Sequence, residues 1–155
     1  MRYWLFKSEA DSYSIDDLER DGTTHWDGVR NYQARNMLRD DIAVGDVVLF
    51  HHSNGDPPAI VGSAMVTRAG YADHTQFDVG SPKFDPKATP DNPRWFMVDI
   101  TFRSRFSAPL TLDMLRGEAA LANMELLRRG SRLSVQPVRE EEYRAIEKMS
   151  SSTHH

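Results

Sequence analysis

The chain of 155 residues contains no cysteine. Disulfide bonds, thiolate nucleophiles and cysteine-ligated zinc are therefore excluded, and packing must supply the stability. Long hydrophobic runs are also absent, because the N-terminal segment holds only four consecutive apolar or aromatic residues before the charge of Lys7. This run is too short for a signal peptide or a membrane span. We expect a soluble, cytoplasmic protein with no membrane partner.

The sequence has no excess of basic residues either: 19 lysines and arginines face 23 aspartates and glutamates, and the net charge is −4. A surface that binds polyanions all over is therefore excluded. The charges are unevenly spread, because residues 9–21 carry six acids and one base, whereas residues 128–139 carry four arginines and no acid. These runs are either two solvated faces or include a local polyanion site, and both interpretations stay open.

Common catalytic signatures are missing as well. There is no Gly-x-Ser-x-Gly elbow, Ser-x-x-Lys pair, phosphate-binding loop or dinucleotide fingerprint. His51 and His52 are adjacent on an expected strand, so their side chains leave opposite faces, and neither His25 nor His74 has a partner at ligand spacing. The last two histidines, at positions 154 and 155, are either native or an addition to the natural chain. We predict no metal site and no cofactor.

Length and composition indicate one globular domain, which we place at residues 1–149, followed by a disordered tail at residues 150–155. Residues 3–6 are apolar on both faces, as in a central strand. Ser14 and Asp17 form a capping box for a short helix through Arg20. Asn31 is the expected N-cap of a second helix over residues 32–38.

The rest of the chain mixes strands with short helices instead of repeating strand–helix–strand units. Residues 47–52 and 59–68 are β-rich and flank a turn, which predicts an antiparallel hairpin. Residues 69–94 are too long for a passive connector, and we interpret them as a lid or wall. The remaining expected elements are a strand at 95–103, helices at 111–116 and 121–129, a strand at 133–138 and a helix at 140–149. The fold class is α+β, a small mixed β-barrel flanked by short helices.

The densest group of potential binding residues lies at positions 26–31, on the loop that enters the second helix. Trp26 offers an aromatic plate for stacking, Asn31 an amide that reads a base edge, and Arg30 a cation for a phosphate. The helix N-terminus itself favours anions. This combination suits a nucleotide. The alternative, that Trp26 simply fills the core, is slightly favoured by composition alone.

Two further segments carry polar side chains suited to the wall of a cavity. Ser53 and Asn54 follow a strand directly, and Arg132, Ser134 and Gln136 alternate with apolar residues, so they project from one face of a strand. An ordinary solvated face of an edge strand explains the second set equally well.

One group of residues, Asp78, Asp85 and Lys87, is compatible with an enzyme. Two acids and a lysine near one divalent ion are the minimum for a metal-dependent nuclease. The alternative is a turn, in which Asp85 caps the backbone and Pro86 fixes it, and this interpretation is favoured.

Several longer blocks resemble the EVE domain, as found in the thymocyte nuclear protein family, and the resemblance runs from Arg2 to Met149. The blocks occur in the family's order, which makes the resemblance far more specific than any single motif. They are Trp4-Leu5-Phe6-Lys7-Ser8-Glu9, Tyr13-Ser14-Ile15-Asp16-Asp17-Leu18, Trp26-Asp27-Gly28-Val29-Arg30-Asn31-Tyr32-Gln33-Ala34-Arg35-Asn36, His52-Ser53-Asn54 and Gly130-Ser131-Arg132-Leu133-Ser134-Val135-Gln136-Pro137-Val138.

The resemblance implies a PUA-like fold, similar to the YTH domains that hold a methylated base in an aromatic cage, and an association with modified bases of DNA or RNA. By position, Trp26 is the implied cage wall. Lys7, Ser8, Asn31, Ser53 and Asn54 are the implied rim, and Arg132, Ser134 and Gln136 the implied closing strand. The sequence departs from the family pattern at Ala10, His51, Phe84 and Ala88, where proline, tyrosine, tyrosine and serine are usual.

Energetics favour a modified base as the ligand. Flipping a base out of a duplex costs a few kcal/mol, while one aromatic stack returns about 1–3 kcal/mol. A buried methyl group adds about 0.8 kcal/mol, which tips a nearly balanced exchange. We therefore expect a monomeric, non-enzymatic binding module for a modified nucleobase. The alternatives are the metal-dependent nuclease and a protein-interaction module with a vestigial pocket.

Overall fold

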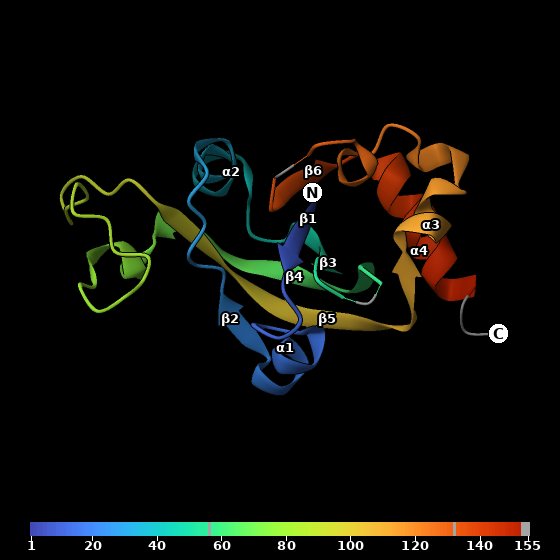
Figure 1. The fold of residues 1–155 in the computed structure, drawn as a ribbon, viewed down its shortest axis with the longest axis horizontal. Helices are drawn as coiled ribbons and strands as arrows, with labels where there is room; N and C mark the ends of the chain where they lie inside the picture. The colour runs from blue at the N-terminus through green and yellow to red at the C-terminus, as the bar shows by residue number, and fades with distance from the viewer. Residues whose placement is uncertain (56, 132, 153–155) are drawn as a thin grey trace.

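The fold is a six-stranded mixed sheet with short helices on its faces and at one end (Figure 1). It is described here from a computed structural model, for residues 1–55, 57–131 and 133–152. The strands are β1 (Tyr3–Ser8), β2 (Thr23–His25), β3 (Val47–His52), β4 (Ala59–Ala72), β5 (Phe96–Thr111) and β6 (Val135–Val138). The α-helices are α1 (Ile15–Asp21), α2 (Tyr32–Asn36), α3 (Leu112–Arg116) and α4 (Glu140–Ser152).

The strand order in the sheet is β2-β5-β4-β3-β1-β6. β1 runs parallel to β3, and every other neighbouring pair is antiparallel. The predicted α+β class and the antiparallel β3–β4 hairpin are confirmed. The sheet stays open, however, because the edge strands β2 and β6 have only three and four residues and each pairs with a single neighbour.

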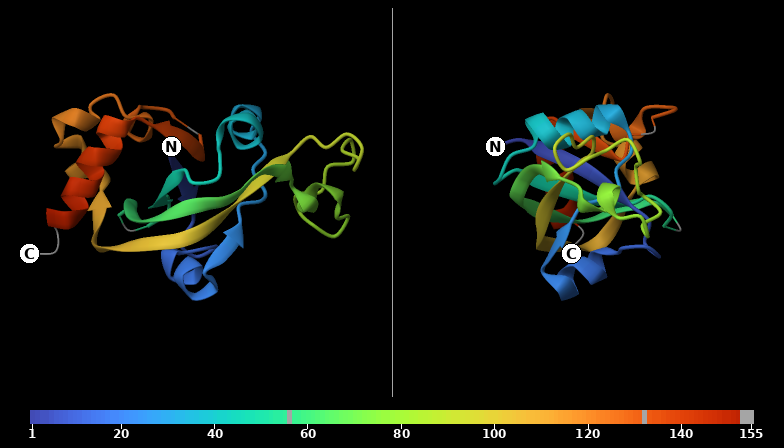
Figure 2. Two further views of the ribbon diagram at one scale, coloured as in Figure 1. Left: turned by 180° about the vertical axis from the view of Figure 1, so that it is seen from behind. Right: turned by 90° about the vertical axis from the view of Figure 1, so that its left-hand side faces the viewer.

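The pair β4–β5 forms the long axis of the molecule (Figures 1 and 2). Its 14- and 16-residue strands connect α3 and α4 at one end with the loop of residues 73–95 at the other. Both strands are much longer than predicted, and four register shifts let the pair bend along its length. The loop keeps one 3-10 turn, His74–Phe77, between the two strands.

Two cores lie on the two faces of the central strands, and this explains why residues 3–6 are apolar throughout. Trp4 and Phe6 join one core beneath α1 and α2, whereas Leu5 joins the other beneath α3 and α4. All three are at most 3% exposed. A strand alternates its side chains between faces, so a strand covered on both sides must be apolar at every position.

Both predicted helix starts are confirmed by their caps. The Ser14 hydroxyl accepts a hydrogen bond from Asp17 N (3.1 Å), and the Asp17 carboxylate accepts one from Ser14 N (2.9 Å). Asn31 Oδ1 accepts from Ala34 N (3.0 Å) at the start of α2. After Asn36 the chain continues as one turn of π-helix, Met37–Asp41.

The C-terminal third differs from the prediction in two places. A helix over residues 121–129 was wrong: two 3-10 turns, Ala119–Leu121 and Glu125–Leu127, occupy this segment. Leu121, Met124 and Leu127 pack into one core at every third position, which matches the three residues per turn of a 3-10 helix.

The predicted tail at residues 150–155 was also wrong at its start. Helix α4 continues to Ser152, and Ser150 is buried, with its hydroxyl donating to Glu147 O (2.7 Å). Residues 153–155, which include the two terminal histidines, lie outside the described part of the chain. Within the described part, no helix has the length and apolar character needed to cross a membrane.

His51 is the most unusual polar residue of the core. It is 3% exposed, and neither ring nitrogen has a hydrogen-bond partner in the described part of the chain. Burial, with a smaller contribution from the nearby charge of Lys7, lowers the pKa of His51 to about 4. The imidazole is therefore neutral in the folded state, while in the unfolded chain it takes up a proton below a pH of about 6.5.

His51 makes the protein less stable as the pH falls. The unfolded state binds the extra proton between pH 6.5 and 4, so stability is full above this window and falls through it. Replacing His51 with phenylalanine removes this titration. Between pH 7.5 and pH 5 we expect the wild type to lose about 2 kcal/mol more unfolding free energy than His51→Phe in urea titrations. Parallel losses in the two proteins would contradict this assignment.

Candidate ligand-binding site

A cleft of about 650 Å³ opens between β1, the connection from β2 to α2, and the loop of residues 73–95. Its size is typical of pockets for small molecules or single nucleotides. Six of the ten predicted site residues line it: Lys7, Ser8, Trp26, Arg30, Asn31 and Ser134. The other lining residues are Glu9, Ser12, Tyr13, Thr24, His25, Asp27, Gly28, Val29 and Lys83.

Trp26 forms a fixed aromatic wall of the cleft. Its backbone N–H donates to Val98 O (2.8 Å), which continues the β2–β5 pairing by one residue. Its half-buried ring packs against Phe6 and Phe50, with ring centroids 5.2 and 5.6 Å away. Trp26 thus lies at the edge of the core and also lines the cleft. Its two interpretations, as a core residue and as a plate for stacking, are therefore compatible.

Arg30 has a different role from the predicted phosphate contact. Its guanidinium donates to Asp73 Oδ2 (3.1 Å), Thr75 Oγ1 (3.1 Å) and the carbonyls of Val29 (3.1 Å) and Lys83 (2.8 Å). Four of its five N–H groups are therefore used within the protein. Arg30 therefore attaches the loop of residues 73–95 to the cleft. This role leaves no local pattern in the sequence, because its partners in that loop lie more than 40 residues away.

Asp73 is the acceptor at the centre of this attachment. Its fully buried carboxylate accepts from Gly28 N (2.7 Å), Thr75 N (2.8 Å) and Thr75 Oγ1 (2.6 Å) in addition to Arg30. Burial alone would raise the pKa of Asp73, but these hydrogen bonds outweigh it and lower the pKa. Gly28 adopts a φ of +79°, a left-handed conformation that aims its N–H at the carboxylate without strain.

Asn31 keeps only part of its predicted capacity to read a base. Its side-chain oxygen caps α2, which leaves the amide nitrogen as a donor at the rim of the cleft. The amide oxygen of Asn31 is thus shared with the cap of α2, and the amide nitrogen stays available as a donor.

Ser53 and Asn54 do not line the cleft but support its wall. Asn54 Oδ1 accepts from Ala10 N (2.6 Å), and its amide nitrogen donates to Asp11 Oδ1 (2.7 Å). Ser53 N donates to Ser8 O (2.9 Å). Both residues hold the end of β1 and the loop after it, in which Glu9, Ser12 and Tyr13 line the cleft. They therefore support the cleft from behind and do not form its rim.

The residues predicted for the closing strand occupy different places in the structure. Ser134 lines the cleft, and its carbonyl accepts from Lys7 N (2.9 Å). Gln136 is fully buried in β6, with its amide nitrogen donating to Leu133 O (2.9 Å), so its predicted place in the cleft was wrong. The strand begins only at Val135, so the alternation read across residues 132–136 does not apply. Arg132 lies outside the described residues.

Two lining residues carry charges in a partly dehydrated setting. Burial lowers the pKa of Lys7, and Glu125 opposes this shift. Burial and the nearby charge of Asp73 raise the pKa of Asp27. Asp27 and Lys83 were not singled out from the sequence, although Asp27 adjoins Trp26 and Lys83 lies in the segment interpreted as a wall. The stem of Lys83 lies close against Gly28.

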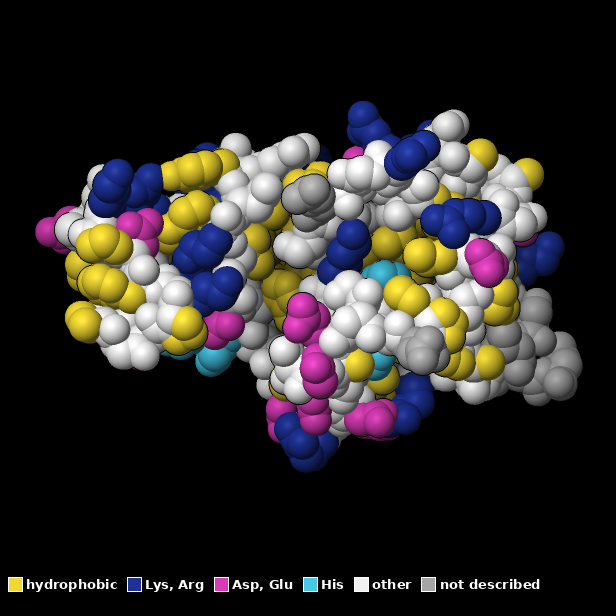
Figure 3. Space-filling model, viewed as in Figure 1, with side chains coloured by type: hydrophobic (Ala, Val, Ile, Leu, Met, Phe, Trp, Pro, Cys, Tyr) yellow, Lys and Arg dark blue, Asp and Glu magenta, His cyan; other side chains and the backbone are white. Residues whose placement is uncertain are grey.

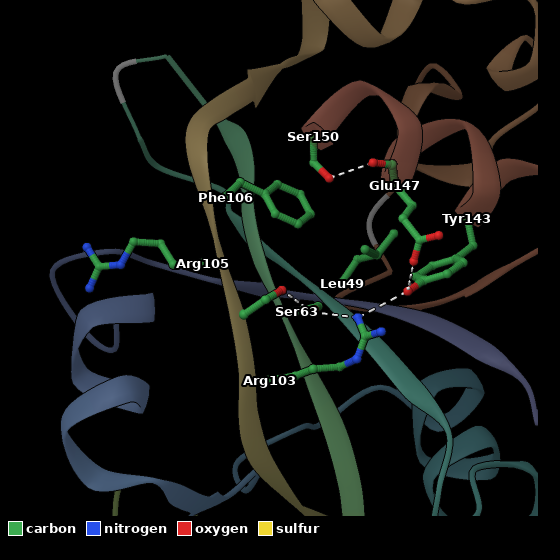
Figure 4. A pocket seen from close by; sticks show the side chains of 9 residues that line it. Leu49, Ser63, Arg103, Arg105, Phe106, Tyr143, Glu147 and Ser150 are labelled. Carbon is green, nitrogen blue, oxygen red and sulfur yellow. Dashed lines mark hydrogen bonds between the residues drawn. The ribbon is translucent and has the colours of Figure 1, made fainter. Parts of the chain in front are cut away.

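A second cavity of about 140 Å³ lies between β5 and α4 (Figure 4). Its polar groups bind one another: Arg103 donates to Ser63 Oγ (3.2 Å) and to Tyr143 OH (3.1 Å), and Tyr143 OH donates to Glu147 (2.9 Å). This network joins α4 to the sheet. It contains none of the residues predicted for the site.

The three residues considered for a nuclease, Asp78, Asp85 and Lys87, take part in hydrogen bonds that stabilise turns. Asp85 accepts from Lys87 N (2.9 Å) and from Trp95 Nε1 (2.8 Å), and Asp78 accepts from Gly80 N (3.0 Å). The turn role predicted for Asp85 is confirmed. Across residues 1–55, 57–131 and 133–152, no cluster of three His, Cys, Asp or Glu side chains is placed to hold a metal ion.

The surface separates charge by region (Figure 3). Acidic side chains gather over α1, while Lys and Arg side chains gather over the lobe formed by α2 and the loop of residues 73–95. The exposed Lys83 and Lys87 belong to this lobe. Basic side chains are therefore found beside the cleft as well as over the end of the molecule that carries β6, α3 and α4.

The fold and the cleft define a small α+β domain with an aromatic-walled pocket, and comparisons with known proteins identify its family. The EVE domain family profile matches residues 2–149. Thymocyte nuclear protein 1 of Rattus norvegicus is 41% identical over 160 residues, covering 91% of this chain and 70% of the rat protein. The chain therefore belongs to the EVE domain family, as the resemblance predicted.

Solved structures agree with this assignment. A hypothetical protein from Leishmania major superposes with a TM-score of 0.94 at 46% identity, covering 100% of this chain and 98% of that one. Human THYN1 in complex with 5-methylcytosine containing DNA superposes with a TM-score of 0.89 at 38% identity, covering 97% and 98% of the two chains.

The Asp73 attachment predicts a large stability effect. Asp73→Ala leaves Arg30 and Gly28 N without their acceptor in a buried setting, so we expect a loss of about 3 kcal/mol or more in urea unfolding. Asp113→Ala removes an aspartate whose side chain is 98% exposed and should change the unfolding free energy by less than about 0.5 kcal/mol. Equal effects of the two substitutions would contradict the central place of Asp73.

Proposed function

We propose that this chain is a non-enzymatic module that binds DNA carrying a modified base, with 5-methylcytosine as the leading candidate, and that the base flips into the cleft beside Trp26. The observation that carries the proposal is the Trp26 ring, which is held by the core and lines a cleft large enough for one base. We expect a monomer to bind a single base in this cleft.

Relatives support the choice of ligand. Human THYN1, with the same fold and 38% identity, was crystallised in complex with 5-methylcytosine containing DNA. This chain shares the family match over nearly its whole length and has an aromatic wall in its cleft. The proposal transfers the class of ligand from that relative to this cleft.

Affinity for an ordinary base is expected to be weak. Flipping costs a few kcal/mol and stacking on Trp26 returns about 1–3 kcal/mol, so the two nearly cancel. A methyl group placed against the ring adds about 0.8 kcal/mol. Discrimination between modified and unmodified cytosine should therefore be modest for each contact and should depend on how closely the cleft fits the methyl group.

Phosphate attraction comes from the lobe beside the cleft in place of Arg30. Lys83 and Lys87 are exposed and form no ion pair with the rest of the described chain. The dehydrated ammonium of Lys7 offers a third cation at the cleft. Binding should therefore weaken as salt rises, with a small slope that reflects only a few phosphate contacts.

The other candidate functions have less support. Asp85 accepts hydrogen bonds from Lys87 N and from the Trp95 indole, and no cluster of three metal-ligating side chains is found among the described residues, so nothing there favours the nuclease. A protein-interaction role makes no use of the fixed Trp26 wall.

Trp26→Ala tests the proposed function. Loss of the stacking plate should weaken binding to an oligonucleotide with one 5-methylcytosine by about tenfold or more, measured by fluorescence anisotropy at fixed salt. Trp26→Phe keeps a smaller plate and should retain most of the affinity. Phe106→Ala removes an aromatic side chain from the second cavity and serves as the matched control.

Three oligonucleotides complete the experiment: the same sequence with cytosine, with 5-methylcytosine, and as RNA with 5-methylcytidine. The proposal requires the methylated DNA to bind most tightly. Equal affinity of the wild type for cytosine and 5-methylcytosine, or an unchanged affinity in Trp26→Ala, would overturn it.

A further inference from the structure

We propose that Asp27 selects cytosine over thymine at the base-binding cleft, by accepting a hydrogen bond from the 4-amino group of the flipped base. This inference rests on the proposed function and names the residue that sets its specificity. It assigns a task to a cleft residue that the sequence analysis left without one.

The position of Asp27 is fixed on both sides. Trp26 N is bonded to Val98 O (2.8 Å) and Gly28 N to the buried carboxylate of Asp73 (2.7 Å). The backbone of Asp27 is therefore held between two anchors that belong to the sheet and to the adjoining loop. Asp27 is an exposed residue that lines the same cleft as Trp26, one position away.

The Asp27 carboxylate has unused acceptor capacity. Among the described residues, no other residue donates a hydrogen bond to it, whereas Asp73 accepts four and Asp85 two. Two histidines, His74 and His25, lie close to this carboxylate. The Nδ1 atom of His25 is engaged with Asp99 at 3.1 Å and with the hydroxyl of Tyr71. Desolvation and the nearby charge of Asp73 raise the pKa of Asp27.

A reader of methylated cytosine faces a particular competitor. Thymine carries the same 5-methyl group and the same O2 acceptor, so neither stacking on Trp26 nor a contact with the methyl group separates the two bases. They differ at positions 3 and 4: cytosine has an acceptor at N3 and an amino donor at position 4, whereas thymine has an N3–H donor and a carbonyl acceptor. A carboxylate placed at position 4 accepts from the amino group and repels the carbonyl, so it separates the two bases there.

No other acidic side chain at the cleft meets these conditions. Glu9 is the remaining carboxylate in the lining, and it lies in the loop after β1 instead of beside the stacking ring. Asp73 also stands close, but its carboxylate is fully buried and saturated. Asp27 alone combines a fixed backbone, a free acceptor and a place next to Trp26 in the described chain.

The test compares 5-methylcytosine with thymine, each placed opposite an abasic site in the same duplex. No base pair then has to open, so the difference in affinity reports contacts in the cleft. We expect the wild type to prefer 5-methylcytosine by about tenfold or more, the size of one well-made base contact. Asp27→Asn presents an amide that donates to the thymine carbonyl, so the preference should fall to about threefold or less.

The ratio of two affinities within one protein cancels any general change in stability or charge. Asp113→Asn, with the same change in charge at a surface position, should keep the wild-type ratio. A preference in Asp27→Asn equal to that of the wild type would overturn the role of Asp27 while leaving the proposed function intact. A wild type that binds 5-methylcytosine no better than cytosine in an ordinary duplex would overturn the proposed function itself.

Discussion

The buried carboxylate of Asp73 is the contact on which the cleft depends. It gathers Gly28, Arg30 and Thr75, and its backbone N–H donates to Trp95 O (3.0 Å). Through its side chain and its backbone, this one residue joins the end of β4, the start of β5 and the loop that carries Trp26. A charge buried this deeply is tolerated only because its acceptors are fully used, so the three segments are bound to one geometry.

This arrangement explains why the cleft has a rigid floor and wall. Trp26 is held by the ring contacts of the core and by a sheet hydrogen bond, and Asp73 fixes the backbone two residues later. Pre-organised walls reduce the loss of freedom on binding, which matters when base flipping nearly cancels stacking. Arg30 contributes to this rigidity by joining the two segments. The proposed cations for phosphate are the exposed lysines nearby, Lys83 and Lys87.

Local signals in the sequence predicted local structure well. The Ser14–Asp17 capping box, the Asn31 cap and the central apolar strand depend on residues close together in the chain, and all three are present. The helix expected over residues 121–129 was wrong, because 3-10 turns replace the α-helix there. Distinguishing the two requires knowing which core the side chains enter.

The site was predictable in position but not in the role of each residue. Trp26, Lys7 and Ser134 line the cleft, yet Arg30, Asn54 and Gln136 turn out to bind the protein itself. An exposed polar side chain and a polar side chain that braces a loop look alike in a sequence. The two kinds of side chain are told apart by their partners, such as Asp73 for Arg30 or Ala10 for Asn54. These contacts span more than 40 residues, so they leave no local pattern in the sequence.

The three tryptophans allow a direct measurement of the central claim that Trp26 stacks on a flipped modified base. The indole N–H of Trp4 donates to Asp46 (2.9 Å) and that of Trp95 to Asp85 (2.8 Å), and both rings are buried, whereas Trp26 faces the cleft. In a ¹⁵N–¹H spectrum titrated with methylated DNA, the account predicts a large shift of the Trp26 indole resonance and nearly constant Trp4 and Trp95 resonances. A Trp26 resonance that stays in place while the DNA binds would contradict it.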